Sequence, residues 1–182
     1  MSAAVVIVAA GKGERFGSSG KVLAPLLDQP VLAHSLNAFE QSDSISEVVL
    51  VAGEHTESDI QQLADSGRWT KIMQVVLGGS SRQDSTARGV DAVSTHADVI
   101  LVHDGARPLI RPAEIDACVS AAREYGGAII ATPVTDTIKR VENGRITATV
   151  DRSDLWAAQT PQGFPADTLR QMMQHAAQTS SA

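Results

Sequence analysis

A buried strand that breaks into a glycine-rich loop is encoded by Val5-Val6-Ile7-Val8-Ala9-Ala10-Gly11-Lys12-Gly13-Glu14-Arg15-Phe16-Gly17, which continues to Lys21. The apolar run 4–10 is too short to span a bilayer and fits a strand covered on both faces. Gly11 and Gly13 let the backbone turn sharply and approach a ligand closely. Backbone N–H groups in such a loop suit anionic oxygens, and Arg15 and Lys21 add full positive charges. The stretch therefore predicts a polyphosphate site.

Four interpretations of this loop compete. A dinucleotide fingerprint needs G-x-G-x-x-G, but Phe16 stands at the third glycine and Gly17 comes one place late. A P-loop needs a Gly-Lys-Ser/Thr end, which residues 11–17 lack. In the third interpretation, Arg15 and Lys21 grip a triphosphate directly. The fourth is a plain tight turn between strand and helix with solvated charges.

Length and charge restrict the class of protein. The 182 residues predict one domain, 1–182, and 43% apolar residues are enough for a sizeable core. A net charge of −6 argues against non-specific nucleic-acid binding, which requires a basic face. Some local cations stand out against this acidic background, namely Arg15, Lys21, Arg82, Arg107 and Lys139.

The single cysteine and the N-terminus bear on the compartment. Cys118 has no partner for an intrachain disulfide, and its helical, apolar surroundings predict a buried, inert thiol. The N-terminus has neither a basic leader nor a cleavage region, and no apolar run reaches the length of a membrane helix. We therefore expect a cytoplasmic protein with no membrane partner.

Strands and helices alternate along the chain, which predicts an α/β domain with a mainly parallel sheet flanked by helices. Thr56-Glu57-Ser58-Asp59 resembles a capping box with Asp in place of Glu or Gln, so a helix is expected from Thr56 to about residue 65. The other expected strands are 47–52, 71–77, 98–102 and 128–131, and further helices are expected after Pro30, Ser85, Pro112 and Pro165.

Two further loops follow predicted strands. The loop 78–85 is glycine-rich and opens a helix, where backbone N–H groups can meet an anion or a base edge. The strand 98–102 delivers Asp104 at its carboxyl end, where open α/β sheets bind their ligands. Asp104 is thus placed like a metal or substrate ligand, and the alternative is a turn or helix cap.

A polar hairpin is predicted near the C-terminal third of the chain. Asn143-Gly144 lies between the β-prone runs 137–141 and 145–150, and Asn-Gly at such a place is a strong hairpin signal. An isolated hairpin is marginally stable in water. We therefore expect the segment at about 135–151 to project as an arm that packs on a second subunit in a homodimer.

Taken together, these motifs resemble the 2-C-methyl-D-erythritol 4-phosphate cytidylyltransferases of isoprenoid biosynthesis, which are relatives of the ribitol-5-phosphate cytidylyltransferases. They occur in the family's order from residue 4 to about residue 175. The matching stretches are Ala9-Ala10-Gly11-Lys12-Gly13-Glu14-Arg15 with Lys21, Gly78-Gly79 with 82–85, Val102-His103-Asp104-Gly105-Ala106-Arg107-Pro108, Asp136-Thr137-Ile138-Lys139, Asp151-Arg152 and Gln159-Thr160-Pro161-Gln162.

The resemblance implies a Rossmann-like nucleotidyltransferase fold, a dimer formed by the hairpin arm, and transfer of CMP from CTP to a sugar-alcohol phosphate with Mg²⁺. By the family pattern, Arg15, Lys21 and Asp104 are the catalytic residues, and Asp104 also serves the metal. The CTP-binding residues implied are Ala9, Ala10, Gly11, Gly13, Gly79 and Ser85. The residues implied for the phosphorylated acceptor, some of them across the dimer interface, are Arg107, Thr137, Arg152 and Thr160.

The chemistry expected from the residues agrees with this resemblance. A phosphate oxygen is already a nucleophile, so no Ser-His-Asp or Cys-His set is required, and the sequence suggests none. Two anions must be brought in line at the α-phosphorus, which demands cations and positioning. Mg²⁺ often takes one carboxylate plus phosphates, which suits a lone Asp104.

The sequence departs from the family pattern in two places. Gly20-Lys21-Val22 replaces the usual Pro-Lys-Gln, so a more mobile loop is expected. The family continues beyond this chain with a Thr-Asp segment and an Asn-Ile-Lys-Val/Ile-Thr strand that helps bind the acceptor phosphate. We expect either a longer natural chain or weakened acceptor binding.

Three other functions remain open at the level of sequence. Ribitol 5-phosphate is the alternative acceptor within the same enzyme class. A nucleotide-binding module without turnover belongs to a different class. A dinucleotide-dependent oxidoreductase is disfavoured by the displaced glycine of the first loop.

Overall fold

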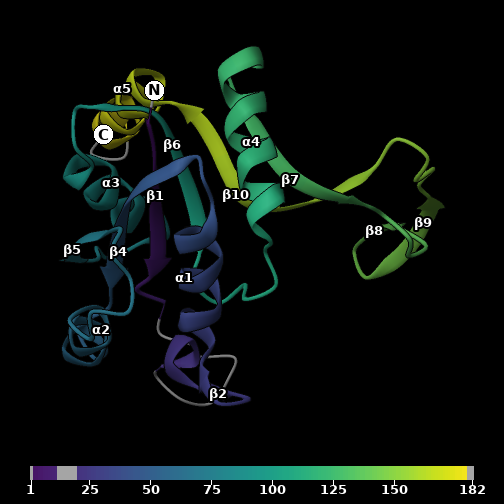
Figure 1. Ribbon diagram of the computed structural model, residues 1–182. Coiled ribbons are helices and arrows are strands. Elements are labelled where there is room, and N and C mark those ends of the chain that lie inside the picture. The colour runs from purple at the N-terminus through teal and green to yellow at the C-terminus, as the bar shows by residue number, and fades with distance from the viewer. Residues whose placement is uncertain (1, 12–19, 180–182) are drawn as a thin grey trace.

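The structure is a computed structural model that describes residues 2–11 and 20–179 (Figure 1). Its centre is a six-stranded sheet with the order β5-β4-β1-β6-β10-β7. Four of these strands are parallel neighbours: β1 (Ser2–Ala9), β4 (Ile45–Ala52), β5 (Ile72–Leu77) and β6 (Ala97–Asp104). The predicted α/β class with a mainly parallel sheet is confirmed.

The alternation of side chains along β1 explains why helices cover both faces of the sheet. Val5 and Ile7 enter one apolar cluster, whereas Ala4 and Val6 enter another, and all four are fully buried. On the first face lie α1 (Val31–Gln41), α2 (Glu57–Ala64) and α4 (Pro112–Tyr125). On the second lie α3 (Arg82–Ala92) and α5 (Ala166–Thr179), as Figure 1 shows.

The helix ends follow the sequence signals in most places. Pro112 is the first residue of α4, and Gly126 ends it in the left-handed conformation at φ 78°. The capping box predicted at Thr56 is wrong, although α2 does begin directly after it. The Thr56 hydroxyl donates to the Gly53 carbonyl at 3.3 Å and makes no capping bond.

The last two strands of the sheet break its parallel order. The strand β10 (Trp156–Pro165) runs antiparallel to both β6 and β7 (Ala128–Pro133). The sequence does not predict this strand, because prolines and glycine are uncommon in strand interiors. It brings residues 159–162 beside the carboxyl end of β6.

The predicted hairpin forms β8 (Lys139–Glu142) and β9 (Arg145–Thr149), which Figure 1 shows standing away from the sheet. Asn143 and Gly144 have φ of 49° and 76°, as a tight two-residue turn requires. Smaller elements follow the first loop, namely the 3-10 helix η2 (Lys21–Leu23) and the short strands β2 (Pro25–Leu26) and β3 (Gln29–Pro30). Among the described residues, the helices are all too short or too polar to cross a membrane.

Candidate active site

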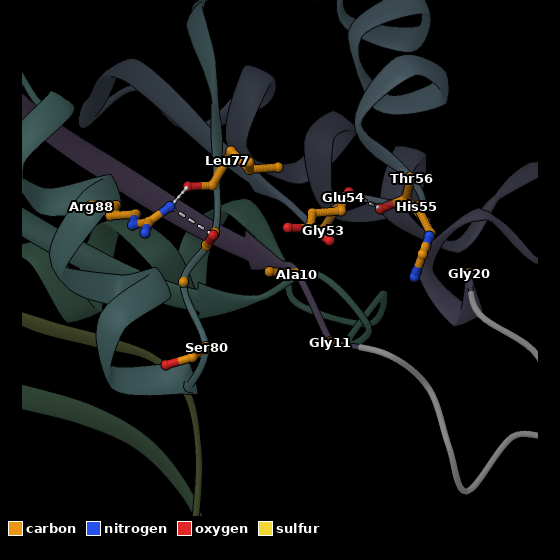
Figure 2. A pocket seen from close by; sticks show the side chains of 12 residues that line it. Ala10, Gly11, Gly20, Gly53, Glu54, His55, Thr56, Leu77, Ser80 and Arg88 are labelled. Carbon is orange, nitrogen blue, oxygen red and sulfur yellow. Dashed lines mark hydrogen bonds between the residues drawn. The ribbon is translucent and has the colours of Figure 1, made fainter.

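A cavity of about 380 Å³ opens at the carboxyl ends of β1, β4 and β5. It is lined by the residues that follow these strands, with Gly20 and Arg88 completing the wall. Figure 2 shows Ala10 and Gly11 between the loop after β4, which carries Glu54 and His55, and the loop after β5. This is the edge where parallel α/β sheets bind ligands.

Glycine is required where the wall is most tightly packed. A Cβ atom on Gly78 would lie 2.5 Å from the Ala10 Cβ and 2.9 Å from the Ser85 Oγ. A Cβ on Gly79 would lie 2.3 Å from the Asp84 Cβ. The second glycine-rich loop therefore packs directly against the end of the first strand and the start of α3.

The loop after β5 satisfies several of its polar groups internally. The Gly79 N–H donates to the Ser85 Oγ at 3.1 Å, and Ser81 and Asp84 form a reciprocal capping box at the start of α3. Arg88 donates to the carbonyls of Leu77 and Gly78 at 3.2 and 2.9 Å. These bonds hold the loop rigid beside the cavity, so its shape is largely set before a ligand binds.

Asp104 lies between two arginines at the end of β6. Its Oδ1 accepts from Arg82 at 2.8 Å and its Oδ2 accepts from Arg107 at 3.0 Å. Burial would raise the pKa of Asp104, but the hydrogen bonds from the two guanidinium groups outweigh burial and lower it. Asp104 is therefore ionised at neutral pH, with a surplus of positive charge around it.

This cluster fits a magnesium ion that is shared with nucleotide phosphates. The described residues contain no group of three His, Cys, Asp or Glu side chains that could hold a metal by themselves. Arg82 donates twice to Oδ1 of Asp104, at 3.3 and 2.8 Å, whereas Arg107 donates once to Oδ2 at 3.0 Å, so acceptor capacity remains on Oδ2. Mg²⁺ commonly combines one carboxylate with phosphate oxygens and waters.

Beneath Asp104, a buried polar network connects β6 with β10. The Asp104 N–H donates to the Thr160 Oγ1 at 3.2 Å, and Thr160 contacts the Nδ1 of His103 at 3.1 Å. The other ring nitrogen of His103 contacts the Arg107 carbonyl at 3.2 Å. Burial lowers the pKa of His103 to about 4. This histidine is neutral in the folded protein at physiological pH.

The residues predicted to bind the nucleotide differ in where they lie relative to the cavity. Ala10, Gly11 and Gly79 line the cavity, whereas Ala9 and Ser85 are buried beside it. Lys21 begins η2, is exposed, and directly follows the cavity residue Gly20. Gly13 and Arg15 lie outside the described residues.

The residues predicted for the acceptor fall into two groups. Arg107 and Thr160 adjoin Asp104 through the contacts given above, and Arg107 also donates to Gln159. Thr137 instead lies within the hairpin arm and Arg152 directly follows it, where Arg152 donates to the Thr135 carbonyl. Among the described residues, no hydrogen bond joins either of them to Asp104.

Sequence reasoning gave no site role to several residues that the structure brings to this edge. The loop 53–56 follows the carboxyl end of β4 and lines the cavity. The rule that α/β sheets bind ligands at the carboxyl ends of their strands would have indicated this loop. Arg82 was visible as a local cation, but its partner Asp104 is distant in sequence. Arg88 carried no signal, because its contacts are with main-chain carbonyls.

Comparison with known proteins identifies the family. The family model for 2-C-methyl-D-erythritol 4-phosphate cytidylyltransferase matches residues 3–182. A protein of that name from Bacillus pumilus is 40% identical over 176 residues, which are 96% of this chain and 76% of the relative. Another from Prochlorococcus marinus is 45% identical over 169 residues, covering 92% of this chain and 74% of the relative.

Solved structures agree with the sequence comparison. A 4-diphosphocytidyl-2C-methyl-D-erythritol synthase from Anaerococcus prevotii superposes with a TM-score of 0.84 at 26% identity, covering 96% of this chain and 74% of that one. A 2-C-methyl-D-erythritol 4-phosphate cytidylyltransferase from Thermus thermophilus has a TM-score of 0.78 at 27% identity, and the match covers 99% of this chain and 78% of that one. Because the family model spans residues 3–182 and the relatives are 40% identical or more over most of the chain, the chain belongs to the 2-C-methyl-D-erythritol 4-phosphate cytidylyltransferase family.

Proposed function

We propose that this protein transfers CMP from CTP to 2-C-methyl-D-erythritol 4-phosphate and releases pyrophosphate, a step in isoprenoid precursor biosynthesis. The observation that carries the proposal is Asp104 between two arginines, at the end of the strand that pairs with β1, in a chain of this family. The relatives and structures described above are named for the methylerythritol substrate or product, which favours this acceptor over ribitol 5-phosphate.

The reaction needs positioning and charge more than acid–base chemistry. An oxygen of the acceptor phosphate forms a bond to the α-phosphorus of CTP. The bond from that phosphorus to the bridging oxygen breaks, and pyrophosphate leaves with the electron pair. Because the attacking oxygen is already anionic, the protein's work is to bring two anions together and to neutralise them.

Each charged residue has a part in this scheme. Lys21 and Arg15 bind the triphosphate, and Arg107 binds the acceptor phosphate. Asp104 would hold Mg²⁺ together with the phosphates, and the ion when bound supplies charge neutralisation at the reacting oxygens. The CTP base and ribose occupy the cavity at the ends of β1, β4 and β5.

A homodimer and a cytoplasmic location complete the proposal. Thr137 lies within the hairpin arm and Arg152 directly follows it, so an arm that packs on a second copy of the chain can bring them to that copy's acceptor site. Cys118 is a free, buried thiol whose pKa burial raises to about 11, which suits a reducing compartment.

Pyrophosphate release tests the proposed function. The protein is incubated with Mg²⁺, one nucleoside triphosphate and one acceptor, and CTP, UTP and ATP are each paired with methylerythritol 4-phosphate and ribitol 5-phosphate. We expect release with CTP and methylerythritol 4-phosphate, and much slower release with the other pairs. CTP binding without release from any acceptor would show a nucleotide-binding module instead of an enzyme.

A further inference from the structure

The buried network under Asp104 contains a histidine that the reaction scheme leaves unused. His103 is fully buried, and its ring meets Phe39 edge to face with 5.0 Å between ring centroids. Both ring nitrogens nevertheless have polar partners, and these partners belong to residues predicted to bind substrate. A histidine that served only as apolar filling would not need them.

The partners of His103 assign its proton. The Arg107 carbonyl can only accept, so the His103 Nε2 carries hydrogen and donates to it. A neutral ring has one N–H, so Nδ1 is an acceptor. The Thr160 hydroxyl must then donate to Nδ1, and its oxygen accepts from the Asp104 N–H. The network therefore runs in one direction, from the Asp104 main chain through Thr160 and His103 to Arg107.

The same network fixes the turn that carries both charged groups. The Arg107 carbonyl oxygen also accepts a hydrogen bond from the buried Ser35 Oγ at 3.2 Å. The bonds from His103 and Ser35 together use both lone pairs of this oxygen. The Arg107 N–H returns to the Asp104 carbonyl at 3.0 Å, and the Gly105 N–H bonds to the Val8 carbonyl on β1. The turn is thus tied to β1, α1 and β10, and little freedom remains at the base of the Asp104 and Arg107 side chains.

We propose that His103 is a positioning residue of the transfer site, which holds the 104–107 turn and the Thr160 hydroxyl in one arrangement through a proton on Nε2. The inference rests on the proposed function. In this arrangement the Thr160 hydroxyl already donates its proton to His103. Thr160 offers the acceptor molecule only a lone pair, so it recognises a substrate hydroxyl and not a phosphate oxygen.

Paired substitutions test the two bonds of His103 separately. In His103→Gln the side-chain amide can still donate to the Arg107 carbonyl, and in His103→Asn the side-chain oxygen can still accept from Thr160. His103→Phe keeps the ring and loses both bonds. We expect His103→Phe to raise the KM for the acceptor and lower kcat, by on the order of 10-fold each, with Gln and Asn intermediate. The KM for CTP should change less than about twofold.

Controls separate positioning from general destabilisation. Ser42 is equally buried and donates to Asp116 at 2.6 Å, at the opposite end of the sheet. Ser42→Ala should lower the melting temperature while leaving both KM values unchanged. Thr160→Val, which keeps the shape and loses the hydroxyl, should reproduce the KM effect of His103→Phe even where His103→Phe folds poorly.

Nitrogen NMR of the histidine ring gives a readout that does not depend on turnover. We expect Nε2 to be protonated and Nδ1 to be unprotonated at neutral pH, as the partners of the two nitrogens require. A proton on Nδ1, or unchanged acceptor KM and kcat in both His103→Phe and Thr160→Val, would overturn the inference. An inactive wild-type protein with the expected NMR pattern would instead overturn the proposed function, and the tautomer assignment would stand.

Discussion

Lys21 and Asp104 carry charges that matter for reaction more than for folding. Lys21 is exposed, and Asp104 is only partly covered by its two arginines. We predict that Lys21→Met and Asp104→Asn each lower kcat by about 100-fold or more, because each removes a charge that stabilises the transition state. The measurement is pyrophosphate release, with thermal unfolding alongside it.

The exposed Asp43 provides the matched control for this pair. Asp43→Asn removes one negative charge far from the cavity and should leave kcat unchanged. Near-normal turnover in either Lys21→Met or Asp104→Asn would remove that residue from the mechanism. A large loss of stability in either variant would mean that its role is structural.

His103 also predicts how stability depends on pH. Its pKa falls from 6.5 in the unfolded chain to about 4 in the folded protein because of burial; the Asp104 carboxylate opposes the fall and the Arg107 charge adds to it. As pH drops below about 6.5, the unfolded state binds a proton that the folded state does not. The free energy of unfolding should therefore decrease between pH 6.5 and 4, by up to about 3 kcal/mol from this residue.

Urea unfolding at several pH values measures this decrease in the free energy of unfolding, with the His103→Phe variant as reference. Other groups titrate in the same range, so the informative quantity is the wild-type decrease minus the decrease in the variant. If the free energy of unfolding decreases equally with pH in the two proteins, a low pKa for His103 is contradicted.

At the scale of elements, α3 packs on the sheet through a glycine. A Cβ on Gly89 would lie 2.3 Å from the Val6 Cγ1 and 2.8 Å from the Val51 Cγ2. Gly89→Ala should therefore destabilise the fold by about 1–3 kcal/mol, although alanine is the better helix former by about 1 kcal/mol. Urea unfolding measures the change.

Asp91 lies exposed on the same helix and serves as the comparison. Asp91→Ala should change the free energy of unfolding by no more than about 0.5 kcal/mol. A stabilised Gly89→Ala would mean that helix propensity outweighs the close contact between α3 and the sheet.

At the scale of the whole molecule, the hairpin arm lacks a core of its own. Val141 and Ile146 are cross-strand partners, yet they are 56% and 66% exposed. A two-stranded hairpin is marginal in water, so these side chains should be covered by a second subunit. We predict that Val141→Lys with Ile146→Lys converts a dimer into a monomer and lowers activity, as measured by sedimentation and pyrophosphate release.

Thr147→Lys places the same charge on the neighbouring residue, whose side chain points to the other face of its strand. This variant should remain dimeric. A wild-type protein that is monomeric and fully active would contradict both the dimer and the shared site.

Much of the fold was readable from local pattern. The apolar run at 4–10 predicted a doubly covered strand, and the nearly continuous burial of β1 between two apolar clusters confirms it. Asn143-Gly144 predicted a hairpin because its backbone conformation is intrinsic to those two residues. The β10 strand was missed, since strand pairing supplied by distant partners outweighed the local preferences of its prolines and glycine.

For the site, local sequence determined which chemical groups are available, and tertiary structure decided what each one contacts. The glycine loops and the strand-end Asp104 were identified from sequence because turn chemistry and the carboxyl-end rule act over a few residues. The pairing of Asp104 with Arg82, and the bond between His103 and Thr160, join residues 22 and 57 positions apart. Only the packing of β6 against its neighbours brings such groups together, and burial there sets the charge state of His103.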